Sequence, residues 1–254
     1  MIIDPLNDER STVTLVDRMG NDLSVVNAAR VSFSTVSTEL TDRDKGLIGF
    51  LARGCPKDEI GALVFTLATS VNREYIRDRL MEFRRMAVHW TPFAQVQLKF
   101  RIKAPFFVAR QWFKHQIGVT RNEISRRYVS TPPEFHIPQE WRLQAPSIKQ
   151  GSSDEPHALS TSISRTVGDI YDHIAELYNH LIFNENICPE QAREILPMAT
   201  YTEWVETGSL AAYARVFNQR SDSHAQYEIN QYAAALGQLV PEEMAISWRA
   251  LTDG

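Results

Sequence analysis

Residues 96–117 read VQLKFRIKAPFFVARQWFKHQI, and this stretch predicts a strand that runs directly into a helix. Apolar and polar residues alternate from Val96 to Ile102, which is typical of a strand with one buried face. Pro105 ends the alternation and suits the first turn of a helix, because a proline there loses no hydrogen bond. We expect that helix to run to about Ile117, so the fold combines sheet and helix.

The sequence on either side of this unit predicts more helices than strands. Apolar residues that recur with the helical period indicate amphipathic helices. We expect helices at 43–53, 58–88, 163–181, 189–196, 207–218 and 223–238. We also expect a hairpin at 12–27 with a turn at Met19–Asp22, an extended segment at 124–130, a loop or lid at 131–157 and a strand at 199–206. The predicted fold class is therefore α+β.

The composition is that of a globular protein and excludes several classes. The chain has 254 residues, a formal net charge of −4 and 43% hydrophobic residues, which excludes collagen-like and wholly disordered chains. No apolar run is long enough to span a membrane, and the N-terminal residues lack the pattern of a secretory signal. Cys55 and Cys188 have no metal-binding spacing. We expect a cytoplasmic protein that does not enter a membrane, hold a metal ion or bind nucleic acid.

The positive charge is concentrated between Lys99 and Arg127. Eight of the 27 Lys and Arg residues lie in this segment, against one acidic residue, Glu123. Apolar residues such as Phe106 and Trp112 are interleaved with them, so the segment is not a simple solvated face. A weakly acidic chain with one basic segment is what a binding site for a small anion would produce.

Residues 109–130, ARQWFKHQIGVTRNEISRRYVS, hold the densest group of chemically useful side chains. On the expected helix, Arg110 lies one turn from Lys114. On the expected extended segment, Ser125 shares a face with Arg127. Guanidinium groups and a hydroxyl suit a phosphate monoester, which needs both charge and directed donors. A structural ion-pair network is the alternative that the residue types leave open.

The same residues resemble the signature of the flavin-dependent thymidylate synthases, which is an Arg-His-Arg triplet followed after seven residues by Ser and then by Arg-Tyr. The triplet here reads Lys114-His115-Gln116, and eight residues separate it from Ser125. Other stretches resemble further blocks of that family in the same order: NAARVSF at 27–33, HWTPFAQVQLKFRIKAPFFVARQWFKH at 89–115, KQGS at 149–152 and REILPMATYTEWVETGSLAAYARVFNQRSDSHAQYEI at 193–229. Because these blocks cover most of the chain, it resembles a divergent member of the family.

The resemblance implies one domain over residues 1–254, with an antiparallel sheet flanked by helices, in a homotetramer whose active sites lie between subunits. It implies FAD as the cofactor, with NADPH and methylenetetrahydrofolate as co-substrates. The implied activity is methylation of a uridine monophosphate at C5, with dUMP as the default substrate and dTMP as its product. The helical stretch at about 55–87 has no matching block, so we interpret it as an insertion.

The resemblance also implies roles for single residues. Arg220 and Ser125 are the catalytic candidates, and Arg220 would lie at the uracil edge, where a cation stabilises charge on a carbonyl oxygen. The residues that match the nucleotide pocket are Gln111, Lys114, Glu123, Ser125, Arg126, Arg127, Arg193 and Arg220. The residues that we assign to the flavin are Ser32, Thr91, His115, Glu123, Ser209, Arg215 and His224.

Two alternatives stand beside this activity. The altered triplet is compatible with the same chemistry on UMP, or on another pyrimidine nucleotide in a modified-nucleoside pathway. It is also compatible with a protein that binds flavin and nucleotide but has lost catalysis. Neither cysteine lies in a matching block, so we expect no cysteine nucleophile.

Overall fold

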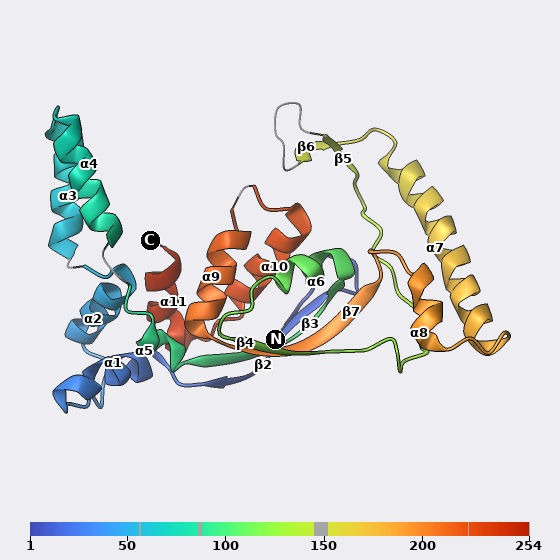
Figure 1. Ribbon diagram of the computed structural model, residues 1–254, viewed down its shortest axis with the longest axis horizontal. Helices are drawn as coiled ribbons and strands as arrows, with labels where there is room; N and C mark the ends of the chain where they lie inside the picture. The colour runs from blue at the N-terminus through green and yellow to red at the C-terminus, as the bar shows by residue number, and fades with distance from the viewer. Residues whose placement is uncertain (56, 86–87, 145–151, 223, 254) are drawn as a thin grey trace. The chain divides into compact units, whose positions relative to one another are not determined.

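The computed structural model describes residues 1–55, 57–85, 88–144, 152–222 and 224–253 (Figure 1). The chain forms two compact units. The first contains Met1–Val16, Lys99–Thr207 and Val216–Leu239, and the second contains Asp17–Leu98, Gly208–Arg215 and Val240–Gly254. A single domain over residues 1–254 stays a prediction.

The first unit is built on a five-stranded sheet with the strand order β1-β2-β3-β7-β4. The strands of this sheet, most of whose residues belong to the first unit, are β1 (Ile2–Ile3), β2 (Thr12–Met19), β3 (Gln97–Pro105), β4 (Val119–Glu123) and β7 (Tyr201–Ser209). β1 and β2 pair antiparallel, with Ile2 opposite Thr14. A second antiparallel sheet joins β5 (Arg142–Gln144) to β6 (Ser152–Pro156), inside the segment predicted as a loop or lid.

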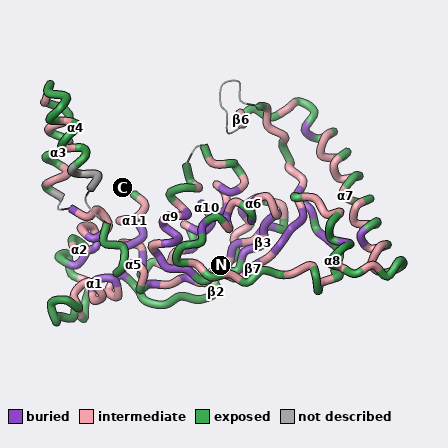
Figure 2. The backbone as a smooth tube through the Cα atoms, viewed as in Figure 1, coloured by how far each residue is buried: buried purple, intermediate pink, exposed green. Residues whose placement is uncertain are grey.

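The strand and helix predicted around Pro105 form the centre of this unit. Phe100 and Ile102 on β3 are fully buried, as is Leu98 at the end of the second unit's range, which confirms the predicted alternation (Figure 2). The chain passes at Pro105 from β3 into α6 (Phe106–Trp112). α10 (Tyr227–Gln238) packs against α6, and the Tyr232 hydroxyl donates to the Lys103 carbonyl at 2.7 Å.

Three further helices contribute to the first unit. α7 (Ser160–Phe183) is the long amphipathic helix that the periodicity predicts, and α8 (Pro189–Ala192) continues into a 3-10 turn at Arg193–Ile195. α9 (Leu210–Arg220) directly follows β7, and its last residues, from Val216 onward, belong to this unit.

The second unit is mainly helical. Its helices are α1 (Asp22–Arg30), α2 (Asp42–Arg53), α3 (Lys57–Thr69), α4 (Arg73–Arg85), α5 (Thr91–Ala94) and α11 (Ala245–Thr252). α11 packs against α1 and α2, and the buried Asp22 carboxylate accepts hydrogen bonds from the N–H groups of Ile246 at 3.1 Å and Ser247 at 2.8 Å. Within the described part of the chain, no helix is long and apolar enough to cross a membrane.

The predicted hairpin at 12–27 is wrong beyond Met19, where the chain leaves β2 and enters α1. Asn21 is the cap of this helix, because its side chain accepts from the Ser24 N–H at 3.0 Å while the Ser24 hydroxyl accepts from the Asn21 N–H at 3.1 Å. The adjacent Val25 and Val26 are both fully buried, which a half-buried strand would not allow.

Two predicted elements near the basic segment also differ. The helix expected to reach Ile117 ends at Trp112, and Gly118 follows with φ of +78°. The extended segment expected at 124–130 contains a turn, in which the Ser125 carbonyl accepts from the Tyr128 N–H at 3.1 Å. A serine hydroxyl that bonds nearby backbone favours such turns over strands.

The helical stretch predicted at 58–88 forms two helices in place of one. Ser70, Val71 and Asn72 separate α3 from α4. The Asn72 side chain accepts from the N–H groups of Glu74 at 3.0 Å and Tyr75 at 3.1 Å, so it caps α4 and interrupts the helix. Residues 56, 86 and 87 of the proposed insertion, and residues 149–151 of the KQGS block, lie outside the described residues.

Asp8 connects the N-terminal segment to the sheet of the first unit through hydrogen bonds. Its carboxylate accepts hydrogen bonds from the Tyr201 hydroxyl, from His136 Nδ1 at 3.1 Å and from the N–H groups of Arg10 at 3.1 Å and Ser11 at 2.8 Å. Burial alone would raise the pKa of Asp8, but these hydrogen bonds outweigh it and hold the pKa well below its usual range.

We expect Asp8→Asn to lower the free energy of unfolding by about 1–3 kcal/mol at pH 7, because the amide cannot accept from all four donors. The pKa of Asp8 is lower in the folded chain than in the unfolded chain, so the stabilisation is present above about pH 4 and is lost as the pH falls further. Urea unfolding at pH 7 and pH 3 measures the difference in the free energy of unfolding between wild type and variant at each pH. The control is Asp17→Asn, at an exposed carboxylate. A difference from the wild type that is equally large at pH 3 would contradict this account.

Candidate functional site

Glu206 on β7 is a buried carboxylate of the first unit, with 1% of its surface exposed. Its Oε1 accepts from Trp112 Nε1 at 2.9 Å, and its Oε2 accepts from Trp204 Nε1 at 3.0 Å and Arg121 Nε at 2.6 Å. A buried charge is tolerated only when it is paired and hydrogen-bonded. These donors therefore fix the end of α6 and the strand β4 against β7.

The same network reaches His115, just beyond α6. Arg121 Nη2 donates to the His115 carbonyl at 2.5 Å, and the His115 ring accepts at Nε2 from Arg220 Nε at 2.9 Å. Arg220 Nη2 also donates to the Gln111 carbonyl at 3.2 Å. Burial lowers the pKa of Arg220, but an arginine stays charged at neutral pH. The structure thus brings together three predicted site residues, Gln111, His115 and Arg220.

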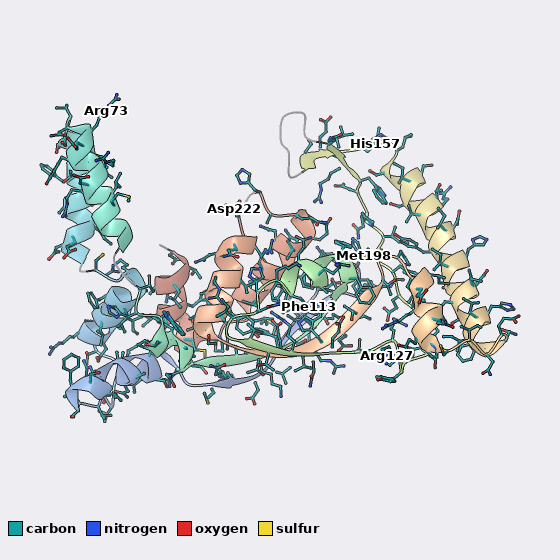
Figure 3. All side chains as sticks on the ribbon, in the orientation of Figure 1. Arg73, Phe113, Arg127, His157, Met198 and Asp222 are labelled. Carbon is teal, nitrogen blue, oxygen red and sulfur yellow. The ribbon has the colours of Figure 1, made fainter. Side chains whose placement is uncertain are left out.

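A pocket of about 480 Å³, here called the arginine pocket, lies between α6, the end of β4 and the segment after α8. Its lining includes Phe113 and Met198, which are labelled in Figure 3. The other lining residues are Phe106, Ala109, Arg110, Glu123, Ile124, Ser125, Arg126, Arg193, Glu194 and Leu196.

The arginine pocket contains three guanidinium groups that form no ion pair with a carboxylate of the described residues. Arg126 donates to the Thr131 carbonyl at 3.0 Å, and Arg193 donates to the Glu190 carbonyl at 3.3 Å. The Glu123 carboxylate accepts from the Thr202 hydroxyl at 2.6 Å. Charges that converge on a pocket without carboxylate partners favour an anionic ligand.

Half of the residues predicted for the nucleotide line this pocket. Those that line it are Glu123, Ser125, Arg126 and Arg193, and those that do not are Gln111, Lys114, Arg127 and Arg220. Arg127 instead pairs with Glu190 at 3.3 Å, and its N–H donates to the Ser125 hydroxyl at 3.3 Å. The expected shared face of Ser125 and Arg127 is therefore wrong, because these residues lie in a turn.

Arg110 lines the arginine pocket and belongs to the group of cations that the residue types predict for a phosphate, although the family resemblance does not assign it to the nucleotide. It lies on α6 four residues after Phe106, which also lines the pocket, so one face of the helix supplies both.

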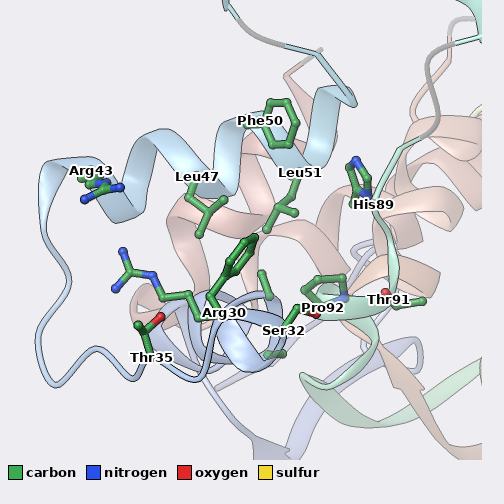
Figure 4. A pocket seen from close by; sticks show the side chains of 13 residues that line it. Arg30, Ser32, Thr35, Arg43, Leu47, Phe50, Leu51, His89, Thr91 and Pro92 are labelled. Atoms are coloured by element: carbon green, nitrogen blue, oxygen red, sulfur yellow. The ribbon is translucent and has the colours of Figure 1, made fainter.

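The second unit contains a pocket of about 820 Å³, here called the helix pocket, between α1, α2 and α5. Two residues predicted for the flavin, Ser32 and Thr91, line it (Figure 4). The rings of Phe50 and His89 stack in it, with centroids 5.7 Å apart. Arg30 pairs there with Asp44, whereas Arg43 makes no ion pair or hydrogen bond with the described residues. The helix pocket therefore offers aromatic surface at one end and a positive charge at the other.

The remaining residues predicted for the flavin do not line the helix pocket. Ser209 and Arg215 belong to the second unit, and His115, Glu123 and His224 belong to the first. His224 lies in the turn before α10, where its Nδ1 is 2.9 Å from Asp222 Oδ1.

A family model described as thymidylate synthase complementing protein matches residues 14–244. The chain belongs to this family. It is 34% identical to a flavin-dependent thymidylate synthase from Thermotoga neapolitana, over 95% of this chain and 91% of the relative. It is 32% identical to a flavin-dependent thymidylate synthase from Thermus thermophilus, over 96% of this chain and 77% of the relative.

Solved structures of similar fold are also found. A UMP/dUMP methylase PolB from Streptomyces cacaoi bound with 5-Br UMP superposes with a TM-score of 0.72 at 24% identity, over 96% of this chain and 94% of that one. The same methylase bound with 5-Br dUMP gives a TM-score of 0.70 at 25% identity, over 96% and 95% of the chains. The predicted family, the α+β fold and the class of enzyme, a thymidylate synthase-like methyltransferase, are confirmed.

We expect Glu206→Gln to lower the free energy of unfolding by about 3–5 kcal/mol, because Arg121 and two indole N–H groups would lose a buried anionic acceptor. Trp204→Phe removes only one of the donors to this anion, so we expect a smaller loss of about 1.5–3 kcal/mol. Urea unfolding at a fixed protein concentration measures both. Equal losses in the two variants would contradict the central role of the carboxylate.

Proposed function

We propose that the chain methylates a uridine monophosphate at C5 with methylenetetrahydrofolate as the carbon donor, FAD as the cofactor and NADPH as the reductant. The default substrate is dUMP, which gives dTMP. The observation that carries this proposal is the arginine pocket, in which Arg110, Arg126 and Arg193 form no ion pair with a described carboxylate. A nucleoside monophosphate has a phosphate that suits guanidinium groups and a planar base that suits an apolar wall such as Phe106 and Phe113.

In this proposal the polar residues that line the pocket bind the nucleotide, and Arg220, outside the pocket lining, acts in catalysis. Ser125 donates a hydroxyl hydrogen bond to the nucleotide, and Glu123 accepts from a ligand N–H or hydroxyl. Arg220 stabilises negative charge on the uracil carbonyl as C5 reacts. His115 and the Gln111 carbonyl hold Arg220 in place, as their hydrogen bonds at 2.9 and 3.2 Å indicate. Gln111, Lys114 and Arg127 complete the proposed nucleotide-binding set.

The helix pocket has the chemistry that FAD requires. Its volume of about 820 Å³ suits a large planar cofactor, Arg43 has a guanidinium free among the described residues for a pyrophosphate, and Phe50 stacked on His89 offers aromatic surface. Ser32 and Thr91 would donate hydroxyl hydrogen bonds to the cofactor. FAD held there and reduced by NADPH would supply the hydride that converts the transferred methylene group into a methyl group. Glu123, His115, Ser209, Arg215 and His224 remain proposed flavin residues.

The proposal includes the assembly and location implied by the family. The enzyme is a cytoplasmic homotetramer whose active sites lie between subunits, with one domain per chain and an insertion at about 55–87. The names of the relatives, flavin-dependent thymidylate synthases from Thermotoga neapolitana and Thermus thermophilus, support the use of flavin.

UMP is the second candidate substrate. The solved methylase that this chain resembles is bound with 5-Br UMP in one structure and with 5-Br dUMP in another, which supports testing both sugars.

The test is to incubate the purified chain with FAD, NADPH, methylenetetrahydrofolate and either dUMP or UMP, and to analyse the nucleotides by mass spectrometry. We expect dUMP to gain one CH2 unit, with NADPH oxidised only when nucleotide is present. Turnover of UMP equal to or greater than that of dUMP would replace the default substrate. Binding of both nucleotides without any methylated product would favour the protein that has lost catalysis.

A further inference from the structure

Arg110 differs from the other arginines of the arginine pocket in its contacts. Arg126 and Arg193 each donate to a backbone carbonyl. Arg110 is exposed on α6 and makes no hydrogen bond or ion pair with any described residue. All of its N–H donors are therefore available to a ligand, whereas the other two arginines have already used a donor.

The acidic residues of the pocket do not neutralise Arg110. Glu123 and Glu194 line the same pocket, but neither forms an ion pair with an arginine of the described residues. Three guanidinium groups against two carboxylates leave the pocket positive, in a chain whose formal net charge is −4. An unpaired excess of positive charge in a concave site favours a small dianion over a neutral ligand.

Arg110 also lies on the face of α6 that lines the arginine pocket. It follows Phe106 by four residues, so both side chains lie on one face of α6 and line the same pocket. Glu206 holds the end of this helix through Trp112, two residues beyond Arg110. The backbone that carries Arg110 is therefore fixed, so binding has to order only its side chain.

We propose that Arg110 binds the phosphate of the nucleotide, with Arg126 and Arg193 as the other guanidinium groups around it. This assignment rests on the proposed function, because it takes a nucleoside monophosphate as the ligand. A planar guanidinium donates two parallel hydrogen bonds to a phosphate, which a lysine cannot do.

The experiment compares Arg110→Gln and Arg110→Lys with the wild type by calorimetric titration of UMP, dUMP and uridine. Arg165→Gln is the matched control, because Arg165 is an exposed arginine of α7 that makes no hydrogen bond or ion pair with the described residues and lines none of the described pockets. We expect Arg110→Gln to weaken the binding of both nucleotides by about 10- to 100-fold and to leave uridine binding unchanged. Arg110→Lys recovers part of the loss, and the control binds as the wild type does.

Two outcomes would overturn the assignment of Arg110. Either Arg110→Gln binds the nucleotides as tightly as the wild type, or it loses uridine and UMP to the same extent, as a distorted pocket would. A wild-type chain that binds no nucleotide overturns the proposed function instead. In that case, titration of inorganic phosphate into the wild type and into Arg110→Gln tests whether Arg110 binds an anion. Equal affinities for phosphate, or no binding to either protein, would overturn the assignment of Arg110 too.

Discussion

The carboxylate of Glu206 accepts hydrogen bonds from the end of α6, from β4 and from its own strand. Its donors are Trp112, Arg121 and Trp204, and the Glu206 side chain is almost completely buried. An ionised carboxylate is stable at such a position only with these partners, so each of the three elements must take the position that it has. The elements that Glu206 fixes in this way are the ones that form two sides of the arginine pocket.

This constraint explains why the basic segment of an acidic chain is not simply a solvated surface. Arg121 pairs with Glu206, and Lys103 pairs with Glu134 at 2.8 Å, so part of the positive charge of the basic segment forms structural ion pairs. Arg110 and Arg126 remain without a described carboxylate and face the arginine pocket. The two interpretations of the basic cluster, a structural ion-pair network and an anion site, therefore apply to different residues of the same segment.

Periodicity predicted β3 and α7, and on β3 the apolar residues are buried at regular intervals as expected. On α7 the helix forms, but Ile170 and Leu177 of its apolar stripe are exposed. Periodicity failed where single polar side chains decide the path of the backbone. Asn21 caps α1 in the segment predicted as a hairpin, and Ser125 forms a turn in the segment predicted as extended. The family resemblance identified Glu123, Ser125, Arg126 and Arg193 of the pocket but not Arg110, whose position depends on which face α6 presents.

Hydrogen–deuterium exchange of the full chain, with and without UMP, measures most directly whether the nucleotide binds in the arginine pocket. A bound ligand slows the opening of the backbone that it contacts. We expect slower exchange at residues 106–112, 123–126 and 193–198, which include or border the lining of that pocket. Slower exchange confined to residues 28–51, which include much of the lining of the helix pocket, or unchanged exchange throughout α6, would contradict nucleotide binding in the arginine pocket.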